Sequence, residues 1–143
     1  MAATSTTHVV VAEPDASTRE AIVALVGEVA TNLGVDVTVH ETTTGTSAFA
    51  ACSDHKPQLL IAEVLLEGLS GLTLMRRLAV ESKTKTAVVF VTDLSREHDR
   101  YWALRNGAIA YLAKPFDAAS LRSKVQRVLT EGPSTSADSP ARI

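Results

Sequence analysis

Five side chains that could carry chemistry each follow a short apolar run in this sequence. They are Glu13, Asp15, Glu63, Thr92 and Lys114. If the apolar runs are parallel strands of one open sheet, their carboxyl ends lie at the same edge, so these side chains converge there. Carboxylates, a hydroxyl and an ammonium from separate strands can hold a magnesium ion, accept a phosphoryl group or form a buried ion pair.

Short apolar runs and segments of helical spacing alternate along the chain, which is typical of a parallel sheet covered by helices. The predicted strands are 8–12, 35–39, 58–62, 86–91 and 109–112, and the predicted helices are 17–33, 44–53, 72–82, 96–106 and 117–129. Gly34 and Gly107 suit helix ends, and Ser95 and Asp117 suit N-caps. The pattern predicts an α/β fold, a doubly wound five-stranded parallel sheet with five helices.

Length and composition indicate one domain. The chain has 143 residues, of which 45% are hydrophobic and 21% charged, a globular balance. We expect the domain to cover residues 8–130. Residues 131–143 are rich in Ser and Pro and cannot bury an apolar face, so they predict a tail or the start of a linker.

Composition also excludes several classes of function. A net charge of -2 with scattered basic residues argues against nucleic-acid or membrane binding. The sequence contains no apolar run long enough to span a bilayer and no signal-peptide pattern, which predicts a cytoplasmic protein. The single cysteine, Cys52, excludes an internal disulfide, and the four histidines are far apart in the sequence, so no structural zinc site is predicted.

The residues at the strand ends resemble the receiver domain of bacterial response regulators, the CheY-like family, over roughly residues 8–130. The matching segments are VVVAEPDASTRE, KPQLLIAEVLLEGLSGLTLMRRL, VVFVTDLS and ALRNGAIAYLAKPF, in this order. The resemblance implies the flavodoxin-like receiver topology and a cis peptide bond between Lys114 and Pro115. It also implies a signalling role rather than an enzymatic one.

The sequence departs from that family at the residues that would do the chemistry. A phosphorylated receiver has an aspartate at the end of the third strand and two adjacent acids after the first strand that hold Mg²⁺. Here these positions are Glu63, Glu13 and Pro14. Proline has no side-chain oxygen, and magnesium tolerates misplaced ligands poorly, so we expect weak or absent Mg²⁺ binding. Asp15 is a candidate replacement ligand, although its side chain should project away.

Glu63 is about 1.5 Å longer than an aspartate, which moves its carboxylate toward the place of a phosphoryl group. Lys114 and Thr92 are retained, so both can bind Glu63 without any phosphate. One hypothesis is a degenerate phosphoacceptor pocket that forms a permanently set switch. The alternative is decay, in which Glu63 and Lys114 only satisfy each other.

Four further residues are candidates for partner binding: Trp102, Arg105, His98 and Tyr111. Helical spacing places Tyr101 and Leu104 on the inner face of the helix 96–106 and leaves Trp102 exposed, where tryptophan is a frequent interface anchor. The alternatives are that Trp102 lies flat over its own helix, that His98 is merely solvated and that Tyr111 is an ordinary half-buried residue. In the family, the face made by the fourth helix, last strand and last helix binds protein partners or forms homodimers.

The leading hypothesis is therefore a phosphorylation-independent, receiver-like protein–protein interaction module, a pseudo-receiver in bacterial signal transduction or localisation. A working receiver that takes a phosphoryl group from a histidine kinase is the rival. A third reading is the regulatory domain of a longer effector. The sequence predicts no catalytic residue, metal ligand or cofactor.

Overall fold

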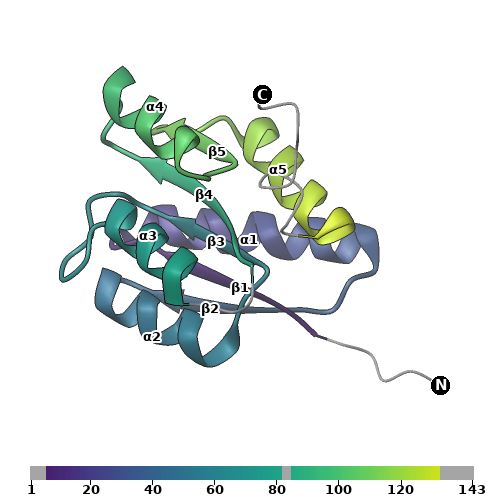
Figure 1. The fold of residues 1–143 in the computed structure, drawn as a ribbon. Coiled ribbons are helices and arrows are strands. Elements are labelled where there is room, and N and C mark those ends of the chain that lie inside the picture. Colours follow the sequence, from purple (N-terminus) through teal and green to yellow (C-terminus); the bar gives the residue numbers. More distant parts are fainter. Residues whose placement is uncertain (1–5, 82–84, 133–143) are drawn as a thin grey trace.

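The protein folds around one five-stranded parallel sheet, and the computed structural model describes residues 6–81 and 85–132. The strands lie in the order β2-β1-β3-β4-β5. Their bounds are β1 Thr7–Ala12, β2 Val37–Thr42, β3 Leu59–Ala62, β4 Ala87–Thr92 and β5 Ala110–Ala113. All four pairs are parallel, which confirms the predicted doubly wound fold and flavodoxin-like strand order (Figure 1).

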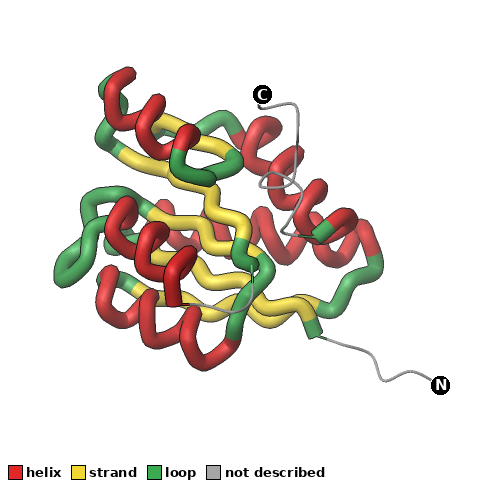
Figure 2. The backbone as a smooth tube through the Cα atoms, in the orientation of Figure 1, coloured by secondary structure: helices red, strands yellow, loops and turns green. Residues whose placement is uncertain are grey.

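Helices cover both faces of this sheet (Figure 2). They are α1 Ala16–Leu33, α2 Gly45–His55, α3 Gly71–Glu81, α4 Glu97–Arg105 and α5 Ala118–Glu131. Buried residues of α1 and α5 form one core with the sheet, and buried residues of α2, α3 and α4 form the other. β1, β3 and β4 are apolar along nearly their whole length because both of their faces are covered.

Several predicted helix ends and strands agree with the structure. Gly34 ends α1 in the left-handed conformation, and Asp117 caps α5 by accepting from the amide of Ser120. The Lys114–Pro115 peptide bond is cis. The second strand was placed too early, because the chain needs residues 35 and 36 to turn from α1 into β2. Residues 133–143 of the predicted tail and residue 82 of the predicted helix lie outside the described residues.

The fourth helix differs from its prediction in start and in orientation. The sequence predicts Ser95 as the N-cap, but the N-cap is Arg96, and no side chain caps this helix. Trp102 is half-buried against the core formed with α2 and α3, whereas Tyr101 is 60% exposed. Ala103 is buried, and Trp102 and Leu104 pack against the same core. Spacing thus placed Leu104 correctly and Tyr101 wrongly, because nine residues contain too few apolar positions to fix the inner face.

No helix in the described ranges has the length and apolar character that crossing a membrane requires.

Candidate functional site

Backbone hydrogen bonds continue one residue beyond the strands and fix three charged residues at the carboxyl edge of the sheet. The amides of Glu13, Glu63 and Lys114 donate to carbonyls of neighbouring strands at 3.0, 3.0 and 2.9 Å. Each residue thus begins a loop with its backbone still held by the sheet. The structure brings these three side chains together with Thr92, the last residue of β4.

Lys114 lies between two buried carboxylates. Its Nζ is 2.8 Å from Oε1 of Glu13 and 2.9 Å from Oε1 of Glu63, with Oδ2 of Asp93 at 3.7 Å. The two glutamate side chains are 2% and 3% exposed. Removing carboxylates from water to this extent is costly without a cation, so one ammonium compensates both.

The Glu63 carboxylate accepts hydrogen bonds from four different donors. Oε1 receives the Lys114 ammonium at 2.9 Å and the backbone amide of Asp93 at 3.2 Å. Oε2 receives the backbone amide of Leu65 at 2.9 Å and the hydroxyl of Thr92. A carboxylate has about four lone-pair directions, so this set saturates it. The four donors form an anion-binding site, and the carboxylate of Glu63 occupies it.

These contacts change the protonation of the ion pair. Burial alone would raise the pKa of Glu63, but the hydrogen bonds from Leu65, Thr92 and Lys114 outweigh it and lower the pKa below 4.5. Burial would likewise lower the pKa of Lys114, but its bonds to Glu13 and Glu63 raise it above 10.5. Both groups are therefore charged at neutral pH.

Asp15, the candidate replacement ligand after β1, is engaged elsewhere. Oε2 of Glu13 accepts the backbone amide of Asp15 at 2.9 Å. The Asp15 side chain caps α1, because its Oδ2 accepts the amide and the hydroxyl of Thr18 at 2.8 and 2.7 Å. Hydrogen bonding to Thr18 lowers the pKa of Asp15. Asp15 thus serves the helix and makes no contact with Glu63 among those described.

Magnesium, which the receiver resemblance implies, does not fit this set of donors. Pro14 offers no side-chain oxygen, and the lone pairs of Glu63 are already taken. An ammonium lies within 3 Å of both remaining carboxylates, at the position where a cation would have to bind them. A magnesium ion would need near-octahedral oxygen ligation and would have to displace this ammonium.

Gly71 allows α3 to begin directly beneath the acidic residue. Its amide donates to the carbonyl of Val64 at 2.8 Å. A Cβ at this position would lie 2.6 Å from the carbonyl oxygen of Glu63 and 2.9 Å from the Phe90 ring. Only glycine accommodates that approach.

Thr92 connects the pocket to Tyr111 through the loop after β4. The Thr92 hydroxyl oxygen binds Glu63 and also accepts the amide of Leu94 at 3.0 Å. The carbonyl of Leu94 in turn accepts the Tyr111 hydroxyl at 2.6 Å. Tyr111 is only 6% exposed, and burial raises its pKa to about 12. Tyr111 nevertheless lines an open depression beside α4, so its part in the predicted contact patch stays a prediction.

The residues of the predicted patch that belong to α4 differ in exposure. His98 and Arg105 are exposed on α4, and Nη1 of Arg105 donates to the Tyr101 hydroxyl at 2.9 Å. Because residues 98, 101 and 105 share one helical face, Tyr101 takes the place that the sequence predicts for Trp102. The open depression beside this helix is also lined by Ser95, Arg100, Pro115 and Asp117 among others.

Sequence reasoning missed the two backbone amides, from Leu65 and Asp93, and the contact between Glu13 and Lys114. Amide directions follow from loop conformation, for which side-chain identity gives no signal. The Glu13 contact could have been found, because a second carboxylate delivered to the same edge by β1 is within reach of the same ammonium.

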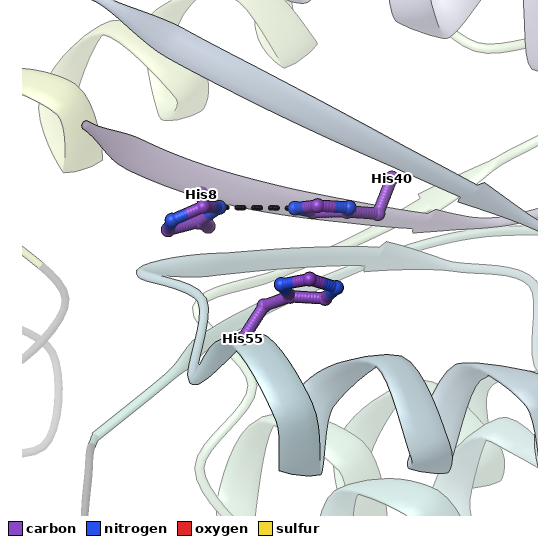
Figure 3. Close-up of side chains that lie close together, drawn as sticks. All are labelled: His8, His40 and His55. Carbon is purple, nitrogen blue, oxygen red and sulfur yellow. Dashed lines mark hydrogen bonds between the residues drawn. The ribbon is translucent and has the colours of Figure 1, made fainter.

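The expectation that the histidines are separate is wrong for three of the four. His8, His40 and His55 come from β1, β2 and the end of α2 and lie together at the opposite edge of the sheet (Figure 3). Sequence distance hides this proximity, because β1 and β2 are adjacent strands and α2 runs back along them.

Comparisons with known proteins agree with the fold. A family model described as response regulator receiver domain matches residues 9–126. Protein PilH of Pseudomonas aeruginosa is 31% identical over 86 residues, which cover 59% of this chain and 71% of PilH.

The phosphate regulon transcriptional regulatory protein PhoB of Rhizobium meliloti is 33% identical over 86 residues, 59% of this chain but only 38% of PhoB. Among solved structures, the Francisella response regulator 1452 receiver domain has a TM-score of 0.73 at 22% identity, covering 87% of this chain and 97% of that one. This likeness supports the fold.

Proposed function

Since the chain belongs to the response regulator receiver domain family, we propose that it is a phosphorylation-independent member, a pseudo-receiver that acts by binding protein partners. The proposal places it in bacterial signal transduction or localisation, in the cytoplasm, without enzymatic activity or a resident cofactor. The observation that carries it is the saturated carboxylate of Glu63.

Saturation opposes phosphorylation for two reasons. To attack a phosphorus atom, a carboxylate oxygen of Glu63 must give up a donor that now neutralises it. The transferred group would also need a divalent cation beside it, and the ammonium of Lys114 already lies between the two carboxylates. Each loss removes stabilisation from the transition state, so a glutamyl phosphate should form slowly or not at all.

The contacts of Thr92 support a switch held in one state. In receivers, an aromatic residue on the last strand turns inward when the hydroxyl residue engages the phosphoryl group. Here the Thr92 hydroxyl engages Glu63, and Tyr111 is buried with its hydroxyl bonded to Leu94. We infer that Glu63 acts as a built-in substitute for a phosphoryl group and keeps the surface of α4, β5 and α5 in the engaged form.

This surface is the proposed partner site. Its exposed residues on α4 are His98, Tyr101 and Arg105, and Arg105 orients the Tyr101 ring from 5.7 Å above its centre. An exposed tyrosine next to an arginine is a frequent combination at protein interfaces. A partner protein or a second copy of the chain would bind here.

A working receiver is the alternative, and family membership together with the retained Thr92 and Lys114 favours it. As a variant of either reading, the chain could serve as the regulatory domain of a longer effector, since it matches only 38% of the length of PhoB.

Phosphotransfer decides between these readings. The protein is incubated with Mg²⁺ and acetyl phosphate, and intact mass spectrometry then detects an added phosphoryl group. The double variant Pro14→Asp, Glu63→Asp is the matched control, because it restores the missing oxygen and shortens the acceptor. We expect no addition to the wild type and measurable addition to the double variant. Labelling of the wild type at Glu63 would overturn the proposal.

A further inference from the structure

Three histidines form a cluster at the amino-terminal edge of the sheet, away from the pocket around Glu63. His8 and His40 lie on the same face of adjacent strands, because His8 pairs with Thr38 and His40 pairs with Val10. His55 is the last residue of α2, which packs against β1 and β2 on this face. The three imidazoles thus come from three separate elements (Figure 3).

The ring nitrogens of the cluster are close together. Nδ1 of His8 and Nε2 of His40 are 3.0 Å apart and share a hydrogen. The rings of His40 and His55 stack with centroids 3.7 Å apart, and one nitrogen from each of the three rings lies within 4.8 Å of the others. His8 and His40 are half-buried and His55 is exposed, so solvent reaches the cluster from the side of α2.

From this geometry we propose that His8, His40 and His55 bind one divalent transition-metal ion of the zinc class. Imidazole is a preferred ligand for Zn²⁺, Cu²⁺, Ni²⁺ and Co²⁺, and three histidines with an open position are a known ligand number for zinc. The fourth position would be taken by water or by a ligand from a partner.

The distances require little rearrangement. Zinc–nitrogen bonds of about 2.0–2.1 Å at a tetrahedral angle place neighbouring nitrogens roughly 3.3 Å apart. The pair formed by His8 and His40 is already near this separation at 3.0 Å. Their shared hydrogen moves to the other nitrogen of the same ring, so no net proton is lost. His55 must turn its ring edge toward the metal, a rotation about a broad side-chain torsion at an exposed residue.

Three imidazole nitrogens that approach one another from separate elements supply the kind of donor that such an ion prefers. No acidic ligand is needed. Binding would join β1, β2 and α2, and it would stabilise the folded state because the unfolded chain has no preformed site.

This inference is independent of the proposed function, since it uses the opposite edge of the sheet. The test is titration of the metal-free full chain with ZnCl₂ by isothermal calorimetry, and with CoCl₂ while visible absorption is recorded. We expect about one equivalent of Zn²⁺ per chain, a tetrahedral Co²⁺ absorption band and a rise in Tm with added zinc.

Two variants locate the ligands. Loss of a residue that only orients a metal ligand weakens metal binding by about 10–100-fold. His55→Ala removes a ligand itself, so it should weaken zinc binding at least as much. His98→Ala is the matched control, because His98 is exposed on α4, outside the cluster. Since His55 is exposed, its variant should fold normally. Absent binding at micromolar zinc, or equal binding by wild type and His55→Ala, would overturn the proposal.

Discussion

The hydroxyl of Tyr111 donates a hydrogen bond of 2.6 Å to the backbone carbonyl of Leu94. The backbone amide of Leu94 donates to the Thr92 hydroxyl, which in turn binds Glu63. The aromatic residue of the last strand is therefore joined to the acid of the third strand by three consecutive hydrogen bonds. If the chain transmits a state from the pocket to its surface, this series of contacts is the structural connection.

Replacing Tyr111 by phenylalanine tests this connection. The ring remains, but the Leu94 carbonyl loses its donor, which should reduce the free energy of unfolding by about 1 kcal/mol. The wild type should show a phenol that ionises near pH 12, because burial raises the pKa of Tyr111, and the variant should lack this step. Ultraviolet absorption during alkaline titration measures it. If the step lost in the variant lay at the ordinary pKa of 10.0 instead, that result would contradict the buried position.

Lys114→Met should strongly destabilise the protein. The methionine retains the apolar stem but leaves two carboxylates, Glu13 and Glu63, buried without their cation. Breaking a buried ion pair costs about 3–5 kcal/mol, which lowers Tm by about 10 °C or more in a domain of this size. Calorimetry gives the value. Arg127→Met is the control, because Arg127 pairs with Glu131 at an exposed position where about 0.5 kcal/mol is expected.

Stability should depend on pH through the same ion pair. The folded-state pKa of Glu63 lies below 4.5, so the unfolded chain binds the proton more tightly. The contribution of Glu63 to the free energy of unfolding is present above pH 4.5 and is lost as pH falls through the folded-state pKa. The pKa of Lys114 is raised instead, so the contribution of Lys114 is lost as pH rises above 10.5. Urea unfolding between neutral pH and pH 3 should show a shallower acid loss in Glu63→Gln.

Tyr101 and Trp102 should respond differently to substitution. Trp102 is half-buried against the core, so Trp102→Ala should cost about 2–3 kcal/mol, less than a fully buried tryptophan. Tyr101→Ala removes a largely exposed ring and should change stability by less than about 1 kcal/mol. If α4 binds a partner or a second copy, only the tyrosine variant should lose binding without losing stability. Chemical unfolding and sedimentation measure the two effects, and a large stability loss in Tyr101→Ala would contradict the exposed position.

The fold was predictable because each strand has its own apolar run and most helix ends have chemical markers. Gly34 and Asp117 end and begin helices where their backbone and side-chain preferences require. The short helix α4 was less predictable. Its nine residues contain two adjacent aromatics, and only contact with the rest of the core decides which of them turns inward.

The pocket was predictable only in its side chains. Parallel strands bring Glu63, Thr92 and Lys114 to one edge, which follows from topology. The amides of Leu65 and Asp93 depend on loop conformation and left no mark in the sequence. The histidine cluster was missed because ligand spacing was judged along the chain, whereas β1 and β2 place His8 and His40 side by side.

The missing side chain at residue 71 lets the start of α3 lie against the backbone of Glu63. Even one methyl group there would press on the carbonyl of Glu63 and tilt the acid away from its donors, while leaving every charged residue unaltered. The residue at the start of α3 can thus alter the buried ion pair of Glu63 by steric contact alone. Any redesign of residue 63 should therefore keep glycine at position 71.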